Sequence, residues 1–192
     1  RTLIGAEHHE HGARFFRVCF SSGLRLCEAL ALTVDDVDLA TGKVRVERQL
    51  DRYGVWPDTK PPKGGRSRVT LFWAAYRQDW ESLVADARAA GREHLFPLHR
   101  SKTKFADRVG VFANEAREAA GWAWSHHWLR HAYASYSLAP VSAGGYGLDL
   151  ASVSQRLGHR KVSVTQDRYV ERLPGADVLA FTATQRRPGR VR

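Results

Sequence analysis

The residues with the clearest potential for chemistry lie in a short segment at residues 125–131 (SHHWLRH). On a helix, His127 and Arg130 are three positions apart and share one face, so an imidazole and a guanidinium can address the same anion. His127 and His131 also have the spacing of a zinc-ligand pair. The zinc-protease pattern, however, requires a glutamate directly after the first histidine, where this chain has Trp128. The segment therefore favours an anion-binding pair over a metalloprotease site.

Two segments further along contain a histidine and a tyrosine that are ambiguous when taken singly. His159 follows Gly158 directly after an amphipathic stretch, which is typical of a helix end and its cap. Ser163 and Gln166 form a capping box, which predicts a short helix that carries Tyr169 in its second turn. By itself, such a histidine is a structural residue, and such a tyrosine is a packing residue with its hydroxyl at the rim.

Two cationic residues upstream complete the set of candidates. Arg25 stands at the expected start of a helix, and Glu28 lies one turn further on, where its carboxylate can orient the guanidinium. Lys63 lies in a turn rich in glycine and proline between two expected strands. Alone, these residues predict no more than an ordinary ion pair and a solvated lysine.

The composition points toward a polyanionic partner. The 192 residues carry 30 Lys and Arg against 20 Asp and Glu, a net charge of +10, and 24 of the basic residues are Arg. Arginine suits bidentate contacts with phosphate, and each cation near a nucleic-acid phosphate releases condensed counterions. An apolar content of 43% excludes a disordered chain, and two cysteines without metal-ligand spacing favour a reduced, cytoplasmic protein. No apolar run reaches the length of about 20 residues needed to span a membrane.

The pattern of apolar residues predicts a fold of the α+β class, mostly helical, with a small antiparallel β-sheet of two or three strands near the N-terminal third. One domain is expected to span residues 1–185, followed by a disordered basic tail at 186–192. The expected strands are 43–48 and 67–72. The expected helices are 7–20, 25–32, 74–90, 106–120, 127–138, 148–157 and 163–171.

Taken together and in order, these segments resemble the signatures of the tyrosine recombinase, or phage integrase, family from about Ser21 to Tyr169. The family's first arginine lies in a T-G-L-R-x-x-E signature, which stands here as residues 22–28 (SGLRLCE). The H-x-L-R-H signature stands as residues 127–131 and the L-G-H signature as residues 157–159, with the tyrosine ten residues later. Four short motifs in the family's order are far more specific than any one of them.

The resemblance implies the catalytic domain of a site-specific DNA recombinase, which cleaves and rejoins DNA strands through a 3′-phosphotyrosyl intermediate, as in integration or excision of mobile DNA. The implied catalytic residues are Arg25, Lys63, His127, Arg130, His159 and Tyr169. In this scheme Tyr169 attacks, the arginines and His159 bind the phosphate, and His127 binds it or takes the tyrosine proton. The lysine protonates the departing 5′ oxygen. No metal and no nucleotide cofactor is implied, because the covalent link stores the energy of the broken bond.

The chain departs from the family pattern at three places. Lys60 and Lys63 both lie in the expected hairpin loop, and Lys63 matches better because a short basic turn and a strand follow it. The loop at 139–147 is longer than the family's usual link and is expected to bulge into solvent, with contact to DNA as the alternative. The family's upstream core-binding domain is missing, and because the sequence has no methionine, the chain is expected to be a catalytic fragment.

Partner, assembly and activity have alternatives as well. The family implies double-stranded DNA as the partner, no membrane, and a tetramer on paired sites, with a monomer as the alternative for an isolated fragment. A type IB topoisomerase uses similar chemistry to relax DNA, and a catalytically silent DNA-binding module is the alternative from another class. The acidic cluster of Asp35, Asp36 and Asp38 is interpreted as a solvated turn, not as a two-metal nuclease site.

Overall fold

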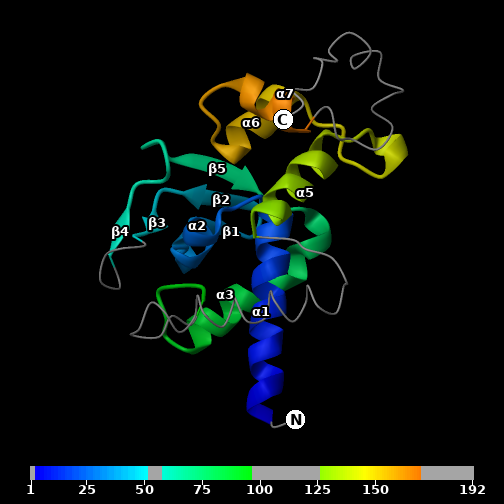
Figure 1. Ribbon diagram of the computed structural model, residues 1–192. Coiled ribbons are helices and arrows are strands. Elements are labelled where there is room, and N and C mark those ends of the chain that lie inside the picture. Colours follow the sequence, from blue (N-terminus) through cyan, green and yellow to red (C-terminus); the bar gives the residue numbers. More distant parts are fainter. Residues whose placement is uncertain (1–2, 52–57, 97–125, 170–192) are drawn as a thin grey trace, which may run out of the picture. The chain divides into compact units, whose positions relative to one another are not determined.

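The computed structural model describes residues 3–51, 58–96 and 126–169, and it describes side chains within 13–51, 58–96 and 127–166. Two compact units divide the chain, residues 1–130 and residues 131–192, and each is described by itself (Figure 1). The expected helix at 106–120 and the expected tail at 186–192 lie outside the described residues.

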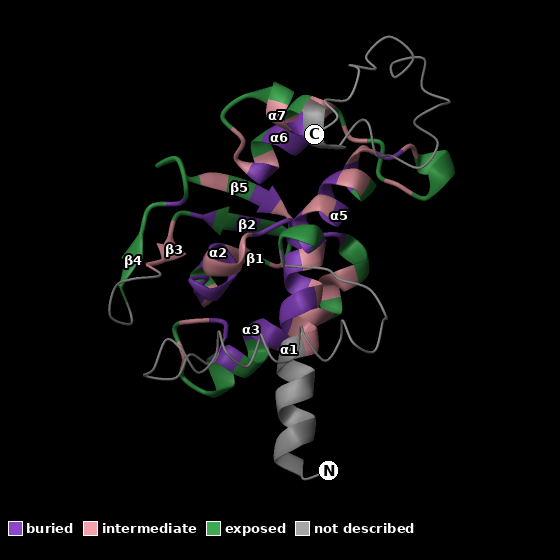
Figure 2. Cartoon of the chain, in the orientation of Figure 1, coloured by how far each residue is buried: buried purple, intermediate pink, exposed green. Residues whose placement is uncertain are grey.

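Two helices, α1 (Leu3–Ser22) and α3 (Arg77–Ala89), pack together in the first unit. Phe15 of α1 and Trp80 of α3 are fully buried in the same hydrophobic core. Figure 2 shows buried residues on both helices where they lie side by side. Removing a large apolar side chain from water contributes about 1.5–3 kcal/mol, so this contact is a main source of stability. Two ion pairs also join the helices, Arg14–Asp86 and Arg17–Asp79.

A three-stranded antiparallel sheet in the order β1-β2-β5 belongs to the same unit. Its strands are β1 (Val37–Asp38), β2 (Lys43–Val46) and β5 (Arg68–Leu71), and a separate antiparallel pair consists of β3 (Gln49–Leu50) and β4 (Thr59–Lys60). Exposed and buried positions alternate along β2, as the period of two predicts, and Val44 and Val46 lie in the core. The sheet confirms the α+β class and the expected number of strands.

Short helical turns join these elements. They are α2 (Leu26–Leu30), η1 (Val34–Asp36) and η2 (Ala74–Tyr76). Gly23 allows the abrupt change of direction from α1 to α2, because its φ of 67° lies in the left-handed region that residues with a Cβ avoid. Its N–H donates to the Cys19 carbonyl at 3.0 Å. The signature segment at 22–28 therefore forms a tight corner between two helices.

The acidic cluster at η1 is only partly solvated, which corrects its interpretation as a solvated turn. Asp35 and Asp38 are exposed, but Asp36 is 3% exposed. The Asp36 carboxylate accepts the backbone N–H of Thr33 at 2.9 Å and a guanidinium N–H of Arg48 at 2.7 Å. Since Arg48 lies twelve residues further along the chain, the local pattern of acidic residues gave no sign of this buried ion pair.

The second unit contains most of α5 (His126–Leu138), then η3 (Val141–Ala143), α6 (Leu150–Leu157) and α7 (Val162–Tyr169). The Asp149 carboxylate caps α6 by accepting the Ser152 N–H at 2.8 Å, and Gly158 ends the helix with a φ of 66°. α6 and α7 pack against each other (Figure 1). The three helices begin within two residues of the expected positions.

The loop at 139–147 folds back on the end of α5. Backbone hydrogen bonds join Gly147 N–H to the Ala139 carbonyl at 2.8 Å and Tyr146 N–H to the Tyr136 carbonyl at 3.0 Å. At Gly145 a Cβ would lie 2.2 Å from the Ala139 carbonyl oxygen, so a glycine is required there. Tyr146 and, above all, Val141 are exposed, the latter by 73%. The loop is thus a closed turn with exposed side chains, and contact with DNA stays a prediction.

Candidate active site

The corner between α1 and α2 brings two of the predicted arginines to one stretch of backbone. Arg25 is the last residue before α2, its backbone is extended, and its side chain is 23% exposed. Arg130, on α5, is buried, and its Nη1 donates to the Gly23 carbonyl at 2.7 Å. One corner of the first unit thus holds two guanidiniums, the positive charge that a phosphate clamp requires.

Glu28 carries a buried carboxylate that accepts hydrogen bonds from two arginines, Arg25 and Arg68. From Arg25 it accepts the backbone N–H at 2.9 Å and Nη1 at 2.8 Å. From Arg68, on β5, it accepts Nη1 at 3.0 Å and Nη2 at 2.6 Å, a bidentate pair. Burial by itself raises the pKa of this carboxyl, but the hydrogen bonds and charges of Arg68 and Arg25 outweigh burial and lower the pKa to about 2. Glu28 is therefore ionised at neutral pH.

The low pKa of Glu28 predicts a loss of stability in acid. Because this pKa is about 2 in the folded protein and about 4.3 in an unfolded chain, its contribution is complete above about pH 4.3 and is lost as the pH falls through 2. The difference corresponds to about 3 kcal/mol of unfolding free energy. Urea unfolding of the wild type and Glu28→Gln should show the wild type's advantage shrinking by about this amount between pH 6 and pH 2. A constant advantage would contradict the prediction.

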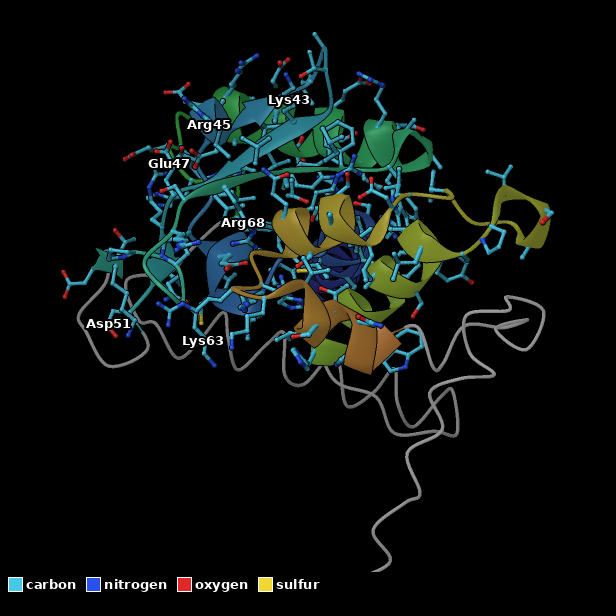
Figure 3. All side chains as sticks on the ribbon, turned by 90° about the horizontal axis from the view of Figure 1, so that it is seen from above. Lys43, Arg45, Glu47, Asp51, Lys63 and Arg68 are labelled. Atoms are coloured by element: carbon cyan, nitrogen blue, oxygen red, sulfur yellow. The ribbon has the colours of Figure 1, made fainter. Side chains whose placement is uncertain are left out.

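Lys63 is exposed, in a turn where the Gly65 N–H donates to the Pro62 carbonyl at 2.8 Å. Within the described residues it has no ion-pair partner. Lys60, the alternative, lies in β4, and its Nζ pairs with an Asp51 carboxylate oxygen at 2.9 Å. Figure 3 shows Lys63 on the loop between β4 and β5. An ammonium held by a carboxylate is less available to a substrate, so this geometry favours Lys63 over Lys60 as the lysine of the site.

His127 is exposed on α5, one helical turn before Arg130. Since both residues belong to one continuous helix, they lie on the same face, as the spacing predicts. Their surroundings differ, because Arg130 is 1% exposed and donates to a backbone carbonyl, whereas His127 is exposed. This face of α5 therefore combines a fixed cation with an accessible imidazole.

In the second unit, His159 lies between the two packed helices α6 and α7. Its backbone N–H donates to the Ser154 carbonyl at 3.1 Å, and its imidazole Nδ1 forms a hydrogen bond with the Thr165 hydroxyl at 2.8 Å. Thr165 is buried on α7, one turn before Tyr169, the last residue of that helix. The Tyr169 side chain lies outside the described residues. A direct contact thus connects the loop of the L-G-H signature with the helix that carries the predicted nucleophile.

The six predicted residues fall into two groups. Arg25, Lys63, His127 and Arg130 belong to the first unit, whereas His159 and Tyr169 belong to the second. Two further residues were missed by sequence reasoning, namely Arg68 and Thr165. The signal for Arg68 is its position two residues before the buried Thr70, which places both side chains on the inward face of β5. The signal for Thr165 is its helical spacing of four from Tyr169.

The described parts of the chain contain neither a cluster of metal-ligating side chains nor a membrane-spanning helix. In those residues no group of three or more His, Cys, Asp or Glu side chains is arranged to hold a metal ion. None of the described helices is both long and apolar enough to cross a membrane.

Known proteins similar to this chain include two kinds of Xer recombinase. The tyrosine recombinase XerC of Azotobacter vinelandii is 34% identical over 148 residues, which cover 77% of this chain and 44% of that protein. The tyrosine recombinase XerD of Pseudomonas putida is 30% identical over 167 residues, or 85% of this chain and 50% of that protein. The chain thus spans about half the length of these relatives.

Solved structures of recombinases share the fold. The Tn1549 transposon integrase, in complex with a circular intermediate DNA, matches with a TM-score of 0.66 at 17% identity and covers 88% of this chain and 55% of its own. The XerA recombinase matches with a TM-score of 0.58 at 20% identity, over 97% and 65%. A family model, that of the phage integrase family, matches residues 4–174. With nearly the whole described chain inside that match, the protein belongs to the phage integrase family.

Proposed function

We propose that this chain provides the catalytic centre of a site-specific DNA recombinase that cuts and rejoins DNA through a 3′-phosphotyrosyl intermediate. The observation that carries the proposal is the pair of arginines at one corner, with Arg130 held on the Gly23 carbonyl and Arg25 two residues further along. Family membership and the names of the relatives, which are tyrosine recombinases, support it. So does the Tn1549 integrase, whose structure contains DNA.

The arginines address the main obstacle to the reaction. A phosphodiester repels nucleophiles, and negative charge builds up on its non-bridging oxygens in the transition state. Arg25 and Arg130 each present a planar set of donors, and Arg130 is fixed before substrate arrives because a backbone carbonyl holds it. His127 adds a group that can donate to the phosphate or accept the tyrosine proton, since an ordinary imidazole has a pKa near 6.5.

Tyr169 is the nucleophile in this proposal, and His159 is a further donor to the phosphate. A phenol with a pKa of about 10 attacks slowly until a base accepts its proton. The hydrogen bond between His159 and Thr165 fixes the imidazole relative to α7, the helix that ends with Tyr169. The phosphotyrosyl link conserves the energy of the broken phosphodiester, so religation to a 5′ hydroxyl requires neither nucleotide nor metal.

Double-stranded DNA is the proposed substrate, bound by a tetramer on paired sites. The net charge of +10 supports a DNA partner, because phosphate contacts gain free energy from counterion release. A tetramer can hold two duplexes side by side and exchange their strands, whereas a single protomer can only cut and reseal one strand.

Trapping of the covalent intermediate tests the proposal. The full-length protein is incubated in EDTA with sheared and lightly nicked genomic DNA of its source organism, so that a short strand with the departing 5′ hydroxyl can diffuse away and the covalent link accumulates. The protein is then denatured with detergent, and the DNA that remains attached is sequenced. We expect the attached strand to end, at its 3′ terminus, in a defined sequence, and a residual nucleotide to remain on the Tyr169 peptide after digestion. An adduct on a different residue, or none, would overturn the proposal. Adducts at unrelated sequences, with plasmid relaxation but no joining of a second duplex, would indicate a topoisomerase.

Lys63 is expected to act as the general acid. Lys63→Ala should slow cleavage of a nicked duplex of the recovered sequence by roughly 10²–10⁴-fold, the usual contribution of a positioned acid. A duplex with sulfur in place of the departing 5′ oxygen should restore the rate, because a thiolate leaves without protonation. Lys60→Ala is the matched control and should cut both duplexes within about threefold of wild type. If Lys60→Ala shows the loss and the rescue, the general acid is Lys60 and the assignment is wrong.

A further inference from the structure

We propose that Arg68 is a positioning residue of the active site, which acts through Glu28 to leave Arg25 with an uncompensated positive charge. The inference rests on the proposed function and adds a residue that the signature motifs do not contain. Both terminal nitrogens of Arg68, Nη1 and Nη2, donate to the Glu28 carboxylate, whereas Arg25 uses only Nη1 and is the more exposed partner, at 23% against 6%.

The hydrogen bonds around Glu28 divide equally between the two arginines. Oε1 accepts Nη1 of Arg25 at 2.8 Å and Nη1 of Arg68 at 3.0 Å. Oε2 accepts the backbone N–H of Arg25 at 2.9 Å and Nη2 of Arg68 at 2.6 Å. Each carboxylate oxygen therefore accepts one hydrogen bond from Arg25 and one from Arg68. Arg68 binds both oxygens through its guanidinium, whereas Arg25 uses its guanidinium for one and its backbone for the other.

The charges of this cluster explain why the second arginine matters. One carboxylate between two guanidiniums leaves a net charge of +1 on the cluster of Arg25, Glu28 and Arg68. Without Arg68, the same buried carboxylate would neutralise Arg25, and the guanidinium would be drawn onto Glu28 and away from a phosphate. Cys19 is a further titratable group near Glu28; burial and the Glu28 charge raise its pKa, so it stays neutral. Arg68 thus supplies the countercharge.

Arg68 also connects the corner to the lysine loop. It begins β5, five residues after Lys63, and pairs with Val46 in the ladder (Figure 3). On the same face of β5, the Thr70 hydroxyl donates to the Ser22 carbonyl at 2.9 Å. Two contacts therefore attach β5 to the segment around Arg25, so one strand sets the position of the arginine and of the loop that precedes it.

The chain offers a matched control for this arrangement. Arg48 also forms an ion pair with a buried carboxylate, Asp36, at 2.7 Å, and Asp36 also accepts a backbone N–H at the start of a short helix. Asp36 and Arg48 take no part in the proposed site. Loss of Arg48, whose side chain is 32% exposed, therefore removes the arginine partner of another buried carboxylate and leaves the charge around Arg25 unchanged.

The test compares Arg68→Gln, Arg48→Gln and the double variant Glu28→Gln/Arg68→Gln in the full-length protein. Single-turnover adduct formation is measured on the nicked duplex recovered by trapping, at several DNA concentrations. We expect Arg68→Gln to lower the maximal rate about 10–100-fold, as loss of outer partners does at metal sites, with an unchanged half-saturating DNA concentration. Arg48→Gln should stay within about threefold of wild type.

The double variant separates charge balance from mere structural support. It removes both charges, restores the net +1 at Arg25, and leaves no unpaired buried ion, so it is expected to fold and to cut within about tenfold of wild type. A double variant no faster than Arg68→Gln would overturn the inference, and so would equal rates for Arg68→Gln and Arg48→Gln. In either case a wild type that forms the adduct would still support the proposed function. An inactive wild type would overturn both.

Discussion

A Tyr169→Phe variant is expected to form no covalent DNA adduct. The substitution removes a single oxygen, the proposed attacking atom, and leaves the ring and the helix α7 in place. Loss of a nucleophile from an enzyme that forms a covalent intermediate costs roughly 10⁴–10⁶-fold in rate, because the remaining groups have nothing to activate. Adduct formation on the nicked duplex is followed by denaturing gel, and DNA binding by fluorescence anisotropy, which should not change.

Tyr146→Phe provides the control for this prediction. Tyr146 belongs to the same unit, is 43% exposed and lies in the loop at 139–147, outside the proposed site. The control should give a wild-type yield of adduct. An adduct that persists in Tyr169→Phe and vanishes in Tyr146→Phe would move the nucleophile to the loop. A Tyr169→Phe protein that no longer binds DNA would assign the hydroxyl to binding instead of attack.

Replacement of Arg130 by alanine should lower both the cleavage rate and the stability of the fold. The buried guanidinium is fixed by the Gly23 carbonyl at 2.7 Å, so it is already oriented when a phosphate arrives and loses little freedom in the transition state. Removal of one fixed donor from such a site costs about 10²–10³-fold in rate. The variant also leaves a cavity and a carbonyl without its donor, so thermal unfolding is expected at a lower temperature.

Arg130→Lys separates these two effects. A lysine keeps the charge and can reach the Gly23 carbonyl, but its single ammonium cannot also present the planar fork that binds two phosphate oxygens. Stability should therefore recover more than cleavage rate does. Arg88→Ala, at an exposed position near the end of α3, controls for the loss of one positive charge and should leave both unchanged. Full cleavage by Arg130→Lys would argue that charge alone suffices.

The local features of this protein could be predicted from its sequence. Arg25 with Glu28, and His127 with Arg130, lie within one helical turn of each other, so their spacing already places them together. The helices and the strands β2 and β5 follow from their apolar periods. The partners of Glu28 and Asp36 could not be predicted in this way. Arg68 lies 40 residues from Glu28, and Arg48 twelve residues from Asp36, so only the folded chain reveals these contacts.

The contact between Arg130 and Gly23 has a consequence for the timing of synthesis. These residues are 107 positions apart, and a ribosome adds about 5–20 residues per second. The corner that carries Arg25 therefore waits between about 5 and 20 s for the second arginine. Glu28 likewise waits for Arg68, 40 residues later. A nascent or prematurely terminated chain that ends before residue 130 therefore lacks the second arginine of the proposed clamp.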